Sequence, residues 1–99
     1  MLLNQIAHAR TGDKGNIVTL SLIAFRKEDF RLIHERVTAD RVAAHFAELI
    51  EGPVERYSLP QLGALNFVLR RPASYTVTRS LALDAHGKCL GSALLALEL

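Results

Sequence analysis

The 99-residue sequence has one cysteine, no tryptophan and no long hydrophobic run. Because a single cysteine, Cys89, cannot form an internal disulfide, nothing in the sequence requires an oxidising compartment. The N-terminus lacks a basic region followed by a long apolar core, and no apolar run reaches the roughly 18 residues of a membrane helix. The sequence therefore indicates neither export nor membrane insertion, and we expect a cytoplasmic protein.

Strong charge of either sign is also lacking, since 12 Lys and Arg against 10 Asp and Glu give a formal net charge of +2. With only two Tyr and four Phe, a base-stacking platform is poorly supported, and we expect no nucleic-acid partner. What the chain does have is 49% hydrophobic residues, which is ample for one core. We expect a single domain over residues 1–99.

Alternating apolar residues predict several short strands. In residues 17–25, Val18, Leu20 and Leu22 alternate with polar residues, as in a strand with one buried face. Other segments with strand character are residues 2–9, 54–59, 62–69 and 75–83. We expect Pro60 to confine the preceding strand to a sheet edge or to end it, because proline has no backbone N–H to donate to a neighbouring strand.

Helical spacing marks three other segments. Residues 30–37 fit a short helix or an irregular crossover. A second helix begins after the N-cap residue Thr38 and runs to Gly52 and Pro53. Residues 90–97 are apolar enough for a buried strand, but their spacing favours a helix. The order of elements predicts an α+β domain with a mainly antiparallel sheet and helices on one face.

The clearest functional candidates lie between the first two predicted strands. They are Arg10, Thr11, Gly12, Asp13, Lys14, Gly15 and Asn16. Gly12 and Gly15 permit a close approach to the backbone, and Arg10 and Lys14 supply positive charge, a combination that suits a phosphate or carboxylate. The alternative is a plain hairpin connection, since Gly, Asp and Asn favour turns for local reasons. If the strands pair directly, this loop projects from one end of the sheet.

A second polar cluster comprises Asp84, His86 and Lys88, for which a solvated turn is the simpler interpretation. Arg70 and Arg71 follow a predicted strand, where arginines are usually solvated. The histidines lack a compact metal-ligand spacing, and we expect no metal. They are His8, His34, His45 and His86. Neither a phosphate loop nor a dinucleotide fingerprint occurs, and we expect no cofactor.

Residues 9–16, Ala-Arg-Thr-Gly-Asp-Lys-Gly-Asn, resemble a stretch of the acyclic terpene utilisation protein A-like (AtuA-like) ferredoxin-fold domain family. Residues 52–57 and 62–67 are similar to later stretches of the same family, and so is the pattern of Asp84 with Gly87 and Lys88 ahead of Leu94, Leu95 and Glu98. The resemblance therefore covers nearly the whole chain. It implies the standalone small form of a ferredoxin-like α/β sandwich. That name describes a topology and not an iron–sulfur cluster, which one cysteine could not hold.

The larger relatives are associated with bacterial breakdown of branched terpenoid acids as coenzyme A thioesters. The resemblance therefore implies a small accessory or binding subunit that works with a larger AtuA-like protein or as a homo-oligomer. Its contacts would come from residues 10–16. The alternative is a small oligomeric enzyme that acts on a coenzyme A thioester or related carboxylic acid, with Asp13 and Lys14 as its polar pair. The family often has Ser or Ala in place of Cys89, which argues against a thiol mechanism.

Overall fold

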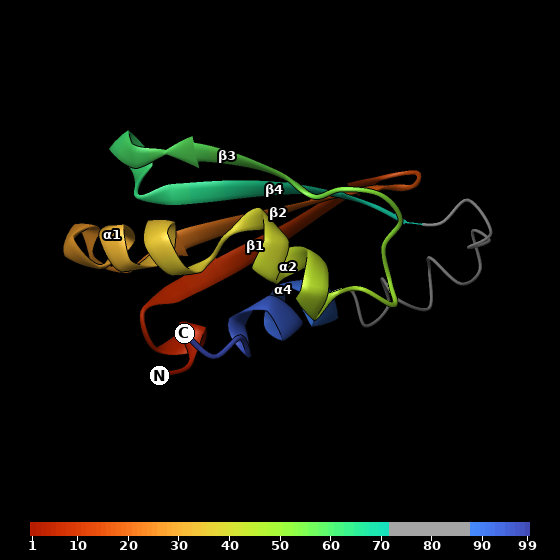
Figure 1. Ribbon diagram of the computed structural model, residues 1–99. Helices are drawn as coiled ribbons and strands as arrows, with labels where there is room; N and C mark the ends of the chain where they lie inside the picture. Colours follow the sequence, from red (N-terminus) through yellow and green to blue (C-terminus); the bar gives the residue numbers. More distant parts are fainter. Residues whose placement is uncertain (72–87) are drawn as a thin grey trace.

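The fold is built on a four-stranded antiparallel sheet with the strand order β1-β2-β4-β3. The computed structural model describes residues 1–71 and 88–99. Its strands are β1 (Ala7–Lys14), β2 (Ile17–Ala24), β3 (Glu55–Leu59) and β4 (Ala64–Arg70), and its α-helices are α1 (Lys27–Arg36), α2 (Ala39–His45) and α4 (Lys88–Leu95). All three helices lie on the same side of the sheet (Figure 1). The structure thus confirms the predicted α+β, ferredoxin-like architecture.

The alternation in β2 and β4 explains why the helices cover only one face. Val18, Leu20 and Leu22 of β2 are buried, as predicted, and Leu65 and Phe67 of β4 lie opposite them in the register and are fully buried. Because side chains alternate along a strand, the intervening residues point to the other face. The core therefore fills the space between the sheet and the helices.

The first strand differs from its prediction. Of the predicted strand over residues 2–9, only residues 7–9 are strand: Leu3–Gln5 forms the short 3-10 helix η1, and β1 begins at Ala7 and continues to Lys14. β1 pairs with β2 from Ala7↔Ala24 to Lys14↔Ile17. Because β2 supplies hydrogen-bond partners along the whole of β1, residues 10–14 form a strand despite their turn-like composition. The predicted seven-residue loop is thus wrong, and only Gly15 and Asn16 connect the strands.

The second helix begins where the sequence predicts and ends earlier. The Thr38 side chain accepts a hydrogen bond from the Arg41 backbone N–H at 3.1 Å, a normal N-cap. α2 ends at His45 instead of continuing to Gly52. Beyond it, the Leu49 N–H donates to the Phe46 carbonyl at 2.8 Å, so three-residue spacing replaces the helical four-residue spacing. This tighter turn directs the chain back towards β3.

The C-terminal segment forms the helix α4, as its spacing predicts, and α4 crosses beneath β1. Gly91 marks their closest approach: a Cβ built there would lie 3.0 Å from Thr11 Oγ1 and 3.6 Å from the Ala9 Cβ. Leu94 on the same helix is fully buried. Position 91 therefore leaves little room for a side chain at the contact between α4 and β1.

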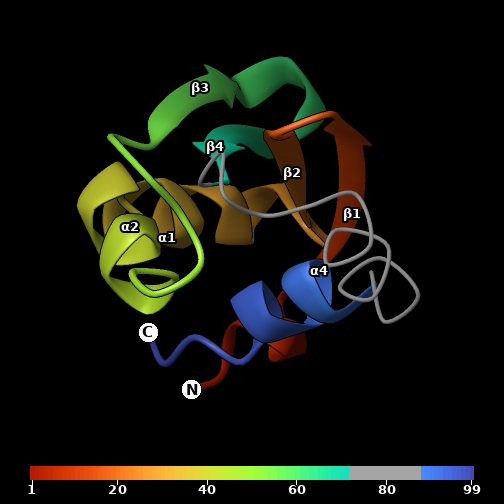
Figure 2. The ribbon, with the colours of Figure 1, turned by 90° about the vertical axis from the view of Figure 1, so that its right-hand side faces the viewer.

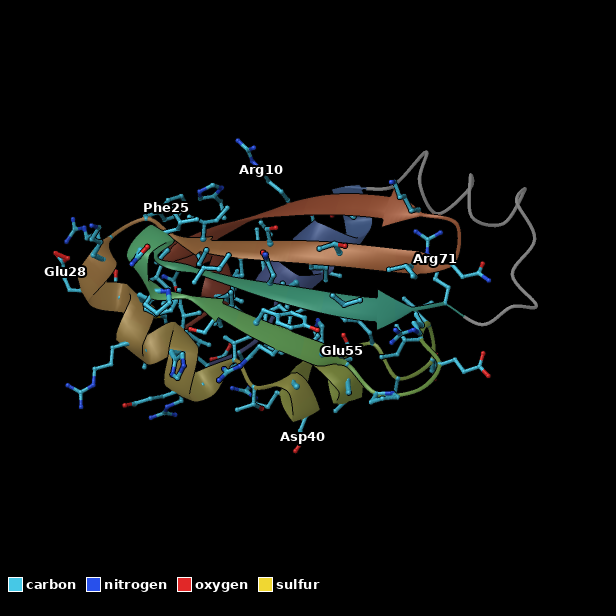
Figure 3. The ribbon with its side chains drawn as sticks, turned by 90° about the horizontal axis from the view of Figure 1, so that it is seen from above. Arg10, Phe25, Glu28, Asp40, Glu55 and Arg71 are labelled. Carbon is cyan, nitrogen blue, oxygen red and sulfur yellow. The ribbon has the colours of Figure 1, made fainter. Side chains whose placement is uncertain are left out.

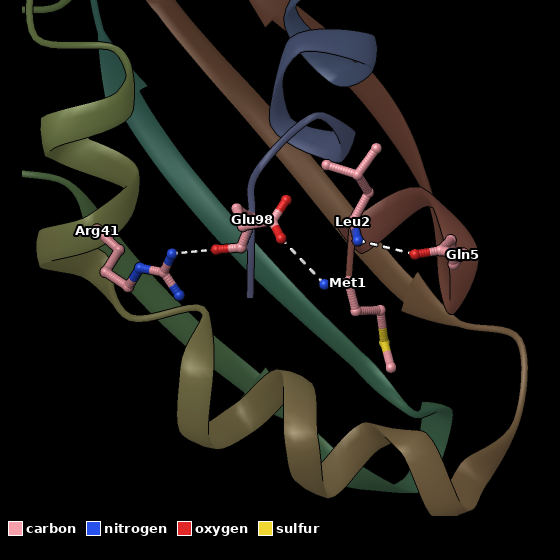
Figure 4. A network of polar contacts seen from close by, with 5 residues as sticks. All are labelled: Met1, Leu2, Gln5, Arg41 and Glu98. Carbon is pink, nitrogen blue, oxygen red and sulfur yellow. Dashed lines mark hydrogen bonds and ion pairs between the residues drawn. The ribbon is translucent and has the colours of Figure 1, made fainter.

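The two ends of the described chain are held together on the helix side of the sheet. The Leu3 N–H donates to the Leu97 carbonyl at 2.9 Å, and the Met1 ammonium lies 3.0 Å from Glu98 Oε1. Arg41 Nη2 donates to the Glu98 carbonyl and thereby joins α2 to this network (Figure 4). Consequently the N-terminal and C-terminal segments stay away from the other face of the sheet.

The predicted strand over residues 75–83 lies outside the described residues. The same holds for Asp84 and His86 of the second polar cluster and for the side chains of Lys88 and Cys89.

Candidate interaction surface on the helix-free face of the sheet

The sheet presents one face that no described helix covers, as the end-on view in Figure 2 shows. We call it the helix-free face and define it by the strand residues that alternate with those facing the helix layer. They are His8, Arg10, Gly12, Lys14, Ile17, Thr19, Ser21, Ile23, Glu55, Tyr57, Leu59, Ala64, Asn66, Val68 and Arg70. Figure 3 views the sheet from this side. The face combines apolar, hydroxyl, amide and charged groups from all four strands.

A polar row crosses the middle of the helix-free face. The register aligns Arg10 with Ser21, Ser21 with Asn66 and Asn66 with Tyr57, so one residue comes from each strand. Paired residues on neighbouring antiparallel strands point to the same face, with their Cβ atoms about 4.5–5.5 Å apart. Arg10 is exposed and projects from the β1 side of the sheet (Figure 3), and Tyr57 is 52% exposed at the other end of the row. The row offers hydrogen-bond donors and acceptors to a partner.

The structure separates the residues that the sequence grouped into one anion site. Arg10 and Lys14 share the helix-free face, but four residues of extended strand put their backbones roughly 13 Å apart. Thr11 lies on the other side, against Gly91, and Asp13 occupies the ladder position opposite Val18. Arg10 and Lys14 are therefore two cationic positions along one face of β1 and not parts of a compact loop.

The two glycines of this segment have different roles. Gly12 has no positive φ and continues the strand, whereas Gly15 has φ 60°. A positive φ at the first central residue and a negative φ at the second, Asn16, is the pattern of a type II′ hairpin turn. The Asn16 carbonyl then accepts a hydrogen bond from the Arg71 N–H at 2.7 Å. The hairpin turn alone therefore explains why Gly15 and Asn16 occur at these two positions.

A charged cluster marks the β3 side of the helix-free face. The Tyr57 hydroxyl donates to Glu55 Oε2 at 2.8 Å, and Arg70 Nη1 lies 3.5 Å from Glu55 Oε1. The tyrosine hydrogen bond and the nearby arginine favour the ionised carboxylate and lower the pKa of Glu55 below its ordinary 4.5. The same hydrogen bond raises the pKa of Tyr57 above its ordinary 10.0. At neutral pH, Glu55 is therefore a fixed negative charge beside the cation of Arg70.

We expect Tyr57→Phe to raise the pKa of Glu55 towards its ordinary value, because the substitution removes the donor that contributes most to lowering it. A titration of the Glu55 carboxyl carbon by NMR measures this. In the wild type, the stabilisation from this cluster is present above pH 4.5 and is lost as the pH falls through the lowered pKa of Glu55. The neighbouring substitution Ser58→Ala is the control. An unchanged Glu55 titration in Tyr57→Phe would show that the hydrogen bond is absent in solution.

One end of the helix-free face is apolar. The His8 ring stacks on Phe25, with centroids 5.4 Å apart and planes 19° from parallel, and Phe25 is 60% exposed. Leu59 lies at the same end, 36% exposed, and Leu62 in the short connection between β3 and β4 is 69% exposed. The Ala24 N–H donates to Gly63 O at 2.9 Å and ties these segments together. Exposed apolar side chains gathered in this way are typical of an interaction surface.

Two arginines have structural roles that the sequence did not reveal. Arg56 Nη1 donates to the His34 carbonyl at 2.8 Å and to the Val37 carbonyl at 2.9 Å, so β3 satisfies the C-terminal end of α1. Arg71 is buried, with 4% exposure, and lines a small cavity of about 10 Å³ with Leu69 and Leu90. The expectation that Arg71 is solvated is therefore wrong, because its side chain is buried beside these apolar residues.

Among residues 1–71 and 88–99, no group of three or more His, Cys, Asp or Glu residues could hold a metal ion. His45 in the last turn of α2 instead has its Nε2 2.6 Å from the Ala93 carbonyl and so joins α2 to α4. In the same part of the chain, no helix is both long and apolar enough to cross a membrane.

The fold and the surface together define a small α+β module in which no helix of residues 1–71 and 88–99 covers one face of the sheet. The family model described as "AtuA ferredoxin-like domain" matches residues 1–99, so the chain belongs to the AtuA ferredoxin-like domain family. This domain also occurs in the larger AtuA-like proteins. No curated protein and no solved structure matches the chain.

Proposed function

We propose that this chain is a small accessory or binding subunit that docks onto a larger AtuA-like protein through the helix-free face. The observation that carries the proposal is that a complete four-stranded face, with exposed apolar and cationic side chains, lies outside the helix layer. Burying such a face against a partner removes apolar surface from water, which favours association. The family relation supports the choice of partner, because the same domain forms part of larger AtuA-like proteins.

The proposed contacts include residues 10–16, which lie in β1 and its turn instead of in one long loop. Arg10 and Lys14 extend from β1 towards acidic side chains of the partner or phosphates of a coenzyme A thioester that it holds. Gly12, which has no side chain, lies between them on β1 and lets a partner approach the backbone there. Gly15 and Asn16 form the hairpin turn at this end of the helix-free face. The process we propose is the bacterial catabolism of branched or terpenoid acyl-CoA compounds in the cytoplasm. In the part of the chain that the structure describes, no contact favours the alternative of a small enzyme.

Two matched substitutions test the proposed docking face. Ser21→Tyr puts a bulky side chain in the middle of the helix-free face, on a strand that tolerates aromatic residues. Ser58→Tyr makes the same chemical change at an exposed position that pairs with the buried Leu65 and so points to the other side. Sedimentation velocity with a purified larger AtuA-like protein from the same organism measures complex formation, and circular dichroism verifies folding.

We expect the wild type and Ser58→Tyr to form the same complex, and Ser21→Tyr to bind at least about tenfold more weakly, because a bulky central residue prevents close packing. Equal binding by both variants would exclude this face as the docking surface. Failure of the wild type to form a complex would contradict the accessory-subunit function.

A further inference from the structure

The helix-free face carries unlike charges on its two edge strands. Arg10 and Lys14 lie on β1, and Glu55 lies on β3 at the other edge of the sheet. Glu55 is paired with Arg70 at 3.5 Å, whereas Arg10 and Lys14 form no ion pair with residues 1–71 and 88–99. The two cations of β1 therefore lack a counter-ion within this part of the chain.

The register of the sheet places Glu55 level with the gap between these two cations. Gly12 lies midway between them on β1, and the row that crosses the face from Gly12 ends at Glu55. The polar row lies next to this row, and a mostly apolar row follows at the end away from the β1–β2 turn. The apolar row consists of His8, Ile23, Ala64 and Leu59.

This order of rows allows a second copy to stack on the same face. A twofold axis that is parallel to the strands and lies between two stacked sheets keeps each row level and reverses the order of the strands. β1 of one copy then lies over β3 of the other, and β2 lies over β4. Stacked sheets are about 10 Å apart, and an angle of about 30° between them shifts the outer strands by only about one residue.

The charges of the two copies become complementary in this arrangement. Glu55 of each copy lies over Gly12 of the other. Because Gly12 has no side chain, the carboxylate has room between the cations of Arg10 and Lys14. The contact occurs twice, once on each side of the axis, so both pairs of β1 cations gain a counter-ion.

The other rows match in the same way. Ser21 lies over Asn66, where hydroxyl and amide groups exchange hydrogen bonds, and the apolar rows lie over each other. At the turn end, Ile17, which is 42% exposed, meets the aliphatic stem of Arg70, whose guanidinium stays beside Glu55. A twofold dimer requires a surface that complements itself, and an unrelated partner imposes no such requirement. The match in each of these rows therefore favours a second copy.

We propose that, in the absence of a partner protein, a second copy of this chain covers the helix-free face in a twofold, face-to-face dimer. This inference goes beyond the docking function, because the larger AtuA-like protein takes the place of the second copy on docking. Four strands about 4.8 Å apart and about seven residues of about 3.3 Å each give a face of about 19 by 23 Å. So small an interface supports a weak dimer, with a dissociation constant on the order of 10–100 µM.

Charge-exchange variants test the two symmetric contacts of this dimer. The first variant is Arg10→Glu with Lys14→Glu, and the second variant is Glu55→Lys. Within the dimer of either variant, like charges oppose each other. In a mixed dimer of the two variants, each new charge again faces an opposite charge on the other copy.

The matched control is Lys27→Glu with Arg31→Glu, which makes the same change of charge at exposed positions of α1 on the helix side. Sedimentation velocity of the chain alone, from about 1 µM to about 500 µM in about 50 mM salt, measures the dissociation constant while charges are only partly screened. Circular dichroism verifies that each variant is folded.

We expect the wild type and the control to change from one chain to two over this range. Each charge variant alone should associate at least about tenfold more weakly, and an equimolar mixture of the two should regain the wild-type affinity within about threefold. A wild type that stays monomeric throughout would overturn the inference and leave the docking function intact, because docking is measured separately with the larger protein.

Self-association that neither charge variant weakens would also overturn the inference, because the second copy would then occupy another surface. Weakened association that mixing does not restore would overturn it too, since the β1 cations and Glu55 would not face each other. If the dimer forms as expected and the wild type does not bind the larger AtuA-like protein, the docking function fails and the inference stands.

Discussion

Phe67→Ala is expected to destabilise the protein by about 3–5 kcal/mol, the range for removing a fully buried phenylalanine. Phe67 is 0% exposed, lies in β4 between two strands, and faces the helix layer with Leu20 as its partner in the register. A 99-residue domain has a total free energy of unfolding of roughly 5–15 kcal/mol, so this loss approaches the stability of the whole fold. Urea denaturation followed by circular dichroism measures the change.

The adjacent residue provides the control for this experiment. Val68 is in the same strand but on the helix-free face, and we expect Val68→Ala to cost no more than about 1 kcal/mol. Similar costs for both substitutions would mean that the two faces of β4 are equally buried, and the helix-free face would then be covered in solution.

The second large effect is expected for Gly91→Leu, which should destabilise the fold by about 1–3 kcal/mol through overpacking. Leucine favours a helix over glycine by up to about 1 kcal/mol, but its Cβ would meet Thr11 Oγ1 at 3.0 Å and the rest of its side chain has to fit at the same contact, so the Thr11 side chain or α4 itself would have to shift. Thermal unfolding followed by circular dichroism measures the change.

Ser92→Leu is the matched control for this substitution, because Ser92 is the next residue of α4 and is exposed. It should be neutral or slightly stabilising. Adding Thr11→Ala to Gly91→Leu removes the hydroxyl at the contact and should recover part of the loss. If Gly91→Leu proves as stable as Ser92→Leu, α4 does not pack closely on β1.

The sequence predicts the fold well where local pattern and tertiary burial agree. The alternation of Val18, Leu20 and Leu22 correctly predicts β2 and its buried face, and Thr38 correctly marks the start of α2. The prediction fails for β1, because its charged and glycine-containing second half has the composition of a loop. That segment is a strand because its backbone pairs with β2, and the composition of the segment alone does not predict this pairing.

The candidate site was predicted only in part for the same reason. Residues 10–16 contribute Arg10 and Lys14 to the helix-free face, but the polar row also needs Asn66 and Tyr57. The β2–β4 register brings Asn66 beside Ser21, and the β3–β4 register brings Tyr57 beside Asn66, so the row depends on the whole sheet. A sequence signal for the true turn was present, since a two-residue connection that begins with glycine is typical of a type II′ hairpin.

The most direct test of the account is an NMR titration of isotope-labelled protein with the larger AtuA-like protein, with signals assigned to both faces of the sheet. The docking function predicts that the largest chemical-shift changes and line broadening occur in the polar row of Arg10, Ser21, Asn66 and Tyr57. Signals from α1 on the helix side, around Arg31, should change least. Perturbations concentrated on α1 and α2, with the polar row unchanged, would contradict the account, because the partner would then bind the helix layer.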